Sequence, residues 1–156
     1  TDSDFNKLEE SDQIIKSDGF LINNANIHGI TDERSQKEGI AFVEFAKQFG
    51  HSLDHVNLIV AHNIQFDINV LASELYRYNQ FDVLNKLLSK KKICTMAHTK
   101  PFVNAKFKSG EGIKDPSLAE LYFYCTGKNL KNQHNSMYDT LNLLECVQIL
   151  HKKKLI

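Results

Sequence analysis

The stretch VNLIVAHNIQFD, residues 56–67, decides the fold of this chain. Its first half, Val56–Ala61, is a compact apolar run with branched side chains, which predicts a buried strand. A helix is expected to follow from about Gln65 to Tyr78, because its apolar residues repeat at helical spacing. The junction between the two elements is a favourable place for a functional site, since strand ends and helix N-termini present side chains and backbone N–H groups to a cleft.

Outward from this stretch, strands alternate with helices, which indicates a single α/β domain over residues 1–156. Further strands are predicted at Gln13–Lys16 and Ile93–Met96, and turns or irregular segments at Thr1–Asn6, Ser17–Gly19, Phe20–Thr31 and Lys100–Lys114. Further helices are predicted at Glu33–Phe49, Phe81–Leu88, Ser117–Cys125 and Met137–Lys153. Gly50 is expected to end the first of these helices, and the third is expected to start at Asp115 and Pro116 and to end at Gly127. The inward faces of the two longest helices are expected at Ile68, Leu71 and Leu75, and at Met137, Leu141, Leu144 and Val147.

Composition narrows the class of protein. Apolar residues make up 42% of the chain, and no apolar run reaches the length of a membrane span, so no membrane partner is expected. The three cysteines are scattered and form no CxxC pair, which favours a reduced, cytoplasmic location. The chain has 19 basic and 19 acidic residues, so its formal net charge is zero. Such a balance is untypical of proteins that coat nucleic acid but compatible with an enzyme that binds only the end of a strand.

Two segments carry residue types that are suited to catalysis or metal binding. Asn63, Phe66 and Asp67 open the helix after the apolar strand, and His134 precedes Asp139 at the entrance of the last helix, with Asn135 near its cap. A carboxylate at such a place binds a metal, and an imidazole beside it moves a proton. Each segment alone is better explained by helix capping and a surface histidine.

Together the two segments resemble the motifs of the DEDDh (DnaQ-like, RNase T-like) exonuclease family. The sequence AHNIQFD, residues 61–67, is similar to the second motif of that family, and HNSMYD, residues 134–139, to the third, with Ser136 where alanine is usual. The loop IHGIT, residues 27–31, and the segment LAEL, residues 118–121, resemble further parts of the family pattern. The resemblance extends over nearly the whole chain.

The resemblance implies a ribonuclease H-like fold, a mixed sheet flanked by helices, and a 3′→5′ exonuclease that releases nucleoside 5′-monophosphates from a DNA or RNA 3′ end. Two divalent cations, Mg²⁺ or Mn²⁺, are implied, with Asp67 and Asp139 as metal ligands and His134 as the general base. These three residues are expected to converge on one cleft. The substrate-binding residues implied are His28, Gly29, His62, Asn63 and Phe66. A DNA polymerase is a further implied partner if the protein proofreads in the manner of a polymerase III epsilon subunit, and action alone stays open.

One part of the family pattern has no counterpart. The chain contains no Asp-x-Glu motif, and Asp2 and Asp4 lie in a polar segment that predicts a turn rather than a strand. We expect a strand carrying that motif to precede Thr1, and residues 1–156 alone to bind metal weakly and to be nearly inactive.

Two other functions stay open at this point. A catalytically inactive nucleic-acid-binding domain of the same fold is one. A zinc protein is the other, although His51 and His55 are expected in a loop after Gly50 and no paired ligand spacing accompanies them. The aromatic run Tyr122–Tyr124 is expected to be core and rim, and the lysine runs at 90–92 and 152–154 to be solvated.

Overall fold

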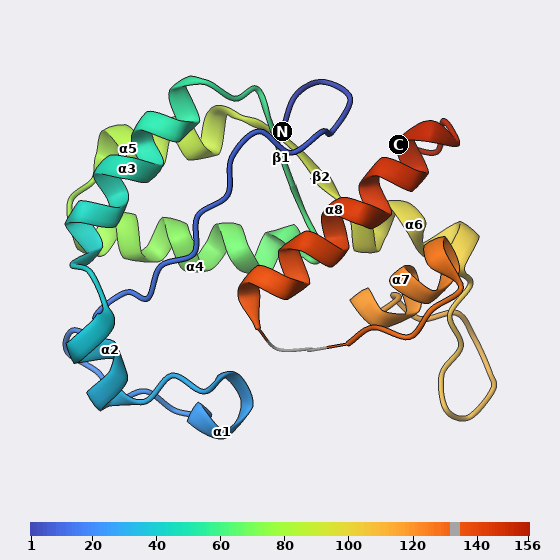
Figure 1. Cartoon of the computed structure of the whole chain (residues 1–156), viewed down its shortest axis with the longest axis horizontal. Coiled ribbons are helices and arrows are strands. Elements are labelled where there is room, and N and C mark those ends of the chain that lie inside the picture. Colours follow the sequence, from blue (N-terminus) through green and yellow to red (C-terminus); the bar gives the residue numbers. More distant parts are fainter. Residues whose placement is uncertain (132–134) are drawn as a thin grey trace. The chain divides into compact units, whose positions relative to one another are not determined.

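The computed structural model describes residues 1–131 and 135–156 (Figure 1). The chain forms two compact units, each described by itself below. Unit 1 comprises Thr1–Glu10, Val60–Gln65 and Ile93–Ile156, and unit 2 comprises Ser11–Ile59 and Phe66–Lys92. In chain order the elements are α1 (Ala25–His28), α2 (Asp32–Glu38), α3 (Phe42–Asp54), β1 (Leu58–Ala61), α4 (Ile64–Arg77), α5 (Phe81–Ser89), β2 (Lys91–Cys94), α6 (Thr95–Val103), α7 (Leu118–Thr126) and α8 (Ser136–Lys152).

The predicted α/β class is confirmed, although the strands are short. Within the described residues, β1 and β2 form a two-stranded parallel sheet. β1 is two residues shorter than the predicted strand, and all four of its residues are half-buried rather than buried. β2 begins two residues before the predicted strand and ends at Cys94, because Thr95 already starts α6.

In unit 2, the single helix predicted over 33–49 is wrong, since α2 and α3 are separate helices. The break lies at Gly39 and Ile40. The backbone of Ile40 donates to the carbonyl of Ile14 at 2.9 Å and accepts from the N–H of Lys16 at 2.9 Å. These bonds form one parallel bridge in place of the strand predicted over 13–16. Gly39 is needed here because a Cβ would collide with the backbone oxygen of Ser35 and would lie 2.8 Å from the nitrogen of Lys16.

The α3 and α5 helices of unit 2 lie side by side (Figure 1). Gly50 was predicted to end the helix, but α3 continues to Asp54. The glycine is inside the helix because α5 approaches closely there, and an added Cβ would meet Cγ2 of Val83 at 2.9 Å. His51 therefore lies on a helix and not in the predicted loop, and its ring contacts that of His55 edge to face, with 4.9 Å between centroids.

In unit 1, α7 packs against both α8 and α6 (Figure 1). The core between α7 and α8 is built on Leu121, Cys146 and Leu150, all of them fully buried. The predicted helix start at Asp115 and Pro116 is wrong, because Ser117 caps α7 instead. Its side chain accepts a hydrogen bond from the N–H of Glu120, and the Glu120 carboxylate accepts from the N–H of Ser117, which forms a capping box.

The α6 helix was not predicted, because its first two residues were assigned to a strand and its last four to an irregular segment. Its buried residues are Thr95 and Thr99, which are polar, so no apolar periodicity marks the helix. The hydroxyl of Thr99 is satisfied by donating to the carbonyl of Thr95 at 2.8 Å.

By contrast α8 was predicted to within one residue at each end. Among the residues that the structure describes, no helix has both the length and the apolar character to cross a lipid bilayer.

Candidate active site

His62, at the end of β1, is hydrogen-bonded through both ring nitrogens within unit 1. Its Nε2 atom lies 2.9 Å from the carbonyl oxygen of Pro116, and its Nδ1 atom lies 3.1 Å from the hydroxyl of Thr95. A carbonyl oxygen only accepts, so Nε2 carries a proton and donates it. The Thr95 hydroxyl also lies 3.2 Å from the carbonyl oxygen of Ala61. The histidine thus connects the end of β1 with the starts of α6 and α7.

The buried surroundings strengthen this connection. Thr95 is fully buried, and Pro116 is among the fully buried side chains of the chain. A hydroxyl has one proton, so Thr95 donates either to the Ala61 carbonyl or to Nδ1 of His62. The bonds of His62 to Pro116 and Thr95 hold neighbouring segments of unit 1 together, and substrate binding by this residue stays a prediction.

The junction after His62 has the geometry expected of a strand-to-helix turn. Asn63 takes the left-handed conformation, with φ of 64°, which asparagine tolerates better than most residues. Phe66 and Asp67 follow in the first turn of α4, where the helix dipole favours a carboxylate. Both are exposed, and 65% of Phe66 is accessible to solvent. A large apolar ring left in solvent at this position is available to a ligand.

The second acidic residue, Asp139, lies in the first turn of α8 and is half-buried. The helix starts as predicted at Asn135, whose side chain accepts a hydrogen bond from the N–H of Tyr138 at 3.2 Å. His134, the predicted general base, lies outside the described residues. Asp139 belongs to unit 1 and Asp67 to unit 2, so their predicted convergence stays a prediction.

The loop at residues 27–31 is ordered by its own hydrogen bonds in unit 2. The N–H of Ile30 donates to Nδ1 of His28 at 3.2 Å, and Nε2 of His28 lies 3.2 Å from the carbonyl of Asn23. Gly29 ends α1 in the left-handed conformation, with φ of 73°. Its carbonyl accepts from Nη1 of Arg34 at 3.3 Å. These bonds give the loop a defined conformation in which the His28 ring is exposed.

Asp2 and Asp4 form the polar turn that was predicted for them. Oδ1 of Asp2 accepts from the N–H groups of Asp4 and Asn6 at 2.9 and 2.8 Å, and Oδ2 accepts from the Asn6 amide at 2.9 Å. Hydrogen bonding from Asn6 holds the pKa of Asp2 below its ordinary value. The Asp2 carboxylate therefore stabilises the turn. Among the residues described, no group of three or more histidine, cysteine, aspartate or glutamate side chains could hold a metal ion.

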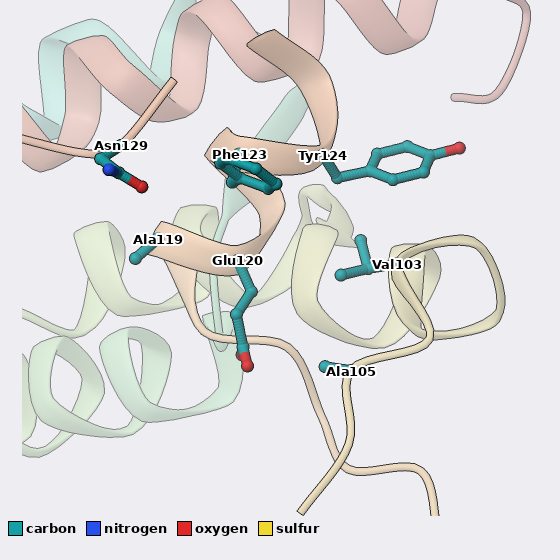
Figure 2. Close-up of a pocket in the computed structure, with 7 residues that line it drawn as sticks. All are labelled: Val103, Ala105, Ala119, Glu120, Phe123, Tyr124 and Asn129. Carbon is teal, nitrogen blue, oxygen red and sulfur yellow. The ribbon is translucent and has the colours of Figure 1, made fainter. Parts of the chain in front are cut away.

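A pocket on the outer face of α7 was missed by the sequence analysis (Figure 2). We call it the α7 pocket, and its lining residues are Val103, Ala105, Ala119, Glu120, Phe123, Tyr124 and Asn129. Phe123 and Tyr124 are 55% and 40% exposed, so they are not core residues. Burial raises the pKa of Glu120, but hydrogen bonds from Lys114 and Ser117 outweigh it and keep that pKa below its ordinary value. The serine three residues before Glu120 was a readable signal for this helix start.

The model of a family described as Exonuclease matches residues 1–147, which include every candidate site residue named above. No curated protein matches the chain significantly.

Proposed function

This chain belongs to the exonuclease family, and from that membership we propose that it is a metal-dependent 3′→5′ exonuclease acting on single-stranded DNA or RNA. Its α/β architecture is of the ribonuclease H-like type. The family match supports a nuclease that hydrolyses nucleic acid. The direction of attack, the two-metal mechanism and the product, a nucleoside 5′-monophosphate, are the proposed part.

The observation that carries the proposal is the placement of the two acidic motifs. Asp67 and Asp139 each lie in the first turn of a long helix, α4 and α8. Backbone N–H groups at such a helix start favour anionic side chains and anionic ligands alike. Two carboxylates at helix starts are the kind of groups that hold a hard cation beside a phosphodiester.

The donor chemistry fits Mg²⁺ or Mn²⁺, because carboxylate oxygens are the ligands these hard cations prefer. In our proposal Asp67 and Asp139 hold the metal ions. When bound, the ions would stabilise the negative charge that develops on the phosphate and increase the acidity of water. The two carboxylates are fewer ligands than two ions need, and further donors must complete the site.

The other residues of the proposed site bind the strand end and move a proton. His134 takes a proton from the attacking water, so that the water's oxygen can form a bond to phosphorus while the bond to the departing 3′ oxygen breaks. Phe66, whose ring is exposed, stacks on the terminal base, and Asn63 donates to or accepts from the same nucleotide. His28 and Gly29 line the part of the site that holds the 3′ end of the nucleic-acid strand. His62 keeps the Asn63 segment in place.

The proposal is tested with short DNA and RNA strands labelled at the 5′ end and incubated with the full-length protein and Mg²⁺. We expect a ladder of products that shorten from the 3′ end, release of nucleoside 5′-monophosphates, and inhibition by EDTA. A mismatched primer terminus, compared with a matched one, separates proofreading from general trimming. Internal cuts or shortening from the 5′ end would contradict the direction, and strand binding without any cleavage would leave a nucleic-acid-binding domain.

A further inference from the structure

We propose that the α7 pocket binds a nucleotide of the substrate strand on the 5′ side of the nucleotide that is removed. This inference rests on the proposed function, because it concerns the same single strand. It names a second contact surface, made of residues outside the segments 61–67 and 134–139, although Ala119 and Glu120 belong to the LAEL segment. The arguments are the exposure of the aromatic rings, the charge around the pocket and the polar groups at its edge.

The aromatic residues of α7 divide between two faces of the helix. Leu121 is fully buried in the core, whereas Phe123 and Tyr124 point away from it and line the pocket. Phe123 is 55% exposed, and Figure 2 shows its ring beside Ala119 and Glu120 from the preceding turn of the same helix. Exposed aromatic rings are a surface on which nucleic-acid bases stack without sequence preference.

The charge around the pocket suits a polyanion. Residues 104–131 contain five lysines and three acidic residues. Two of these acids are already neutralised, since Asp115 pairs with Lys100 at 2.9 Å and Glu120 pairs with Lys114. From the end of α8, Nζ of Lys153 lies 5.9 Å from the centre of the Tyr124 ring. A strand that stacks on Phe123 would therefore find Lys153, beside Tyr124, as a cation for its phosphates.

The polar groups of the pocket match the edge of a base better than they match an apolar partner. The Asn129 side chain offers an amide donor and a carbonyl acceptor, and the Glu120 carboxylate is an acceptor that also has Lys114 as its own donor. A pocket with two exposed aromatic rings, an amide and a carboxylate that is paired with a lysine is suited to single-strand recognition.

The experiment compares Phe123→Ala with Phe107→Ala, a matched control, because Phe107 is 52% exposed in the same unit but does not line the pocket. Binding of fluorescent DNA and RNA strands is measured by anisotropy in EDTA, so that no cleavage occurs. We expect Phe123→Ala to raise the Kd about fivefold or more, as loss of one stacked base does. Phe123→Tyr, which keeps the ring, should restore binding, and Phe107→Ala should bind like the wild type.

A second assay separates this inference from the proposed function. The nitrophenyl ester of thymidine 5′-monophosphate contains only the terminal nucleotide, so its hydrolysis should be the same in Phe123→Ala and wild type. If the wild-type protein hydrolyses neither the ester nor a strand, the proposed function fails, whatever the pocket binds. Unchanged strand affinity in Phe123→Ala, or an equal loss in Phe107→Ala, overturns the pocket proposal. A wild-type dimer that Phe123→Ala dissociates, with strand binding intact, also overturns it and assigns the pocket to contacts between copies.

Discussion

The Nε2 atom of His62 donates a hydrogen bond of 2.9 Å to the carbonyl oxygen of Pro116, 54 positions further along the chain. This bond joins the end of β1 to the residue just before the cap of α7. His62 belongs to the motif that resembles a substrate-binding segment, yet its described bonds are to Pro116 and Thr95. Its contribution to activity is therefore expected to come through the position of its neighbours.

His62→Ala should lower the free energy of unfolding by about 1–3 kcal/mol, because the Pro116 carbonyl loses its donor in a buried place. The measurement is urea denaturation. The control is His98→Ala, because His98 also donates to a backbone carbonyl, that of Leu155 at 2.6 Å, but is exposed. His98→Ala should lower the free energy of unfolding by less than His62→Ala does. Unchanged stability of His62→Ala together with a raised KM would instead show that the ring contacts the substrate.

Glu120 should make the stability of the protein depend on pH in acid. Its pKa in the folded protein lies below the ordinary value of 4.5, so its ionisation stabilises the fold above that pH. The contribution is lost as the pH falls through the folded-state pKa. Glu120→Gln should flatten the fall of unfolding free energy below pH 4.5, and an unchanged fall would contradict this role of the carboxylate. Ser117→Ala should cost about 1 kcal/mol at neutral pH by removing the helix cap.

Gly39→Ala should destabilise the protein by about 1–3 kcal/mol, since its Cβ would meet backbone atoms of Ser35 and Lys16 that cannot move independently. Gly50→Ala is the matched comparison. Its Cβ would meet only the end of the Val83 side chain, and alanine gains about 0.5–1 kcal/mol of helix propensity over glycine. Gly39→Ala should therefore have a lower melting temperature than Gly50→Ala in thermal unfolding. Equal melting temperatures would refute the steric explanation of the break between α2 and α3.

Asp67→Asn and Asp139→Asn should each lower exonuclease activity about 100-fold or more in the full-length protein, because even outer partners of metal ligands cost 10- to 100-fold when removed. Asp82→Asn is the control, since Asp82 is also an exposed aspartate in the first turn of a helix of unit 2. It should retain full activity. Mn²⁺ binding followed by paramagnetic resonance should weaken in the first two variants only. Retained activity in either of them would remove that residue from the metal site.

His134→Ala should lower turnover about 10²- to 10⁴-fold, which is the usual size of general base catalysis. Because its proposed role is proton transfer, the affinity for Mn²⁺ should stay close to that of the wild type. Asp139→Asn, in contrast, should lose both turnover and metal affinity. An equal loss of metal affinity in the two variants would contradict this division of roles.

Some elements could be predicted because their signals are local. The α8 helix was predicted to within one residue at each end, since its cap, Asn135, lies immediately before it. The α7 helix ends at Thr126 because Gly127 readily takes the left-handed conformation, with φ of 71°. Its start was misread, because the Asp115–Pro116 pair also resembles a helix start.

The motif residues were likewise readable, and the family match includes them. The sequence by itself determined the α/β class, the helix starts that carry Asp67 and Asp139, and the exonuclease family. The class and the helix starts depend on periodicity and capping within a few residues, whereas the family rests on the resemblance of the motifs and on the match over residues 1–147.

Only the tertiary structure decided the break at Gly39, the existence of α6, the bonds of His62 and the exposure of Phe123. Each depends on contacts between distant parts of the chain. Ile40 leaves the helical conformation to pair with the segment at Ile14 and Lys16, which are 24 or more positions away. The α6 helix buries Thr95, whose hydroxyl contacts Ala61 and His62, more than 30 positions away. Hydrogen bonds and burial between distant residues outweigh local propensity, and a sequence pattern does not contain them.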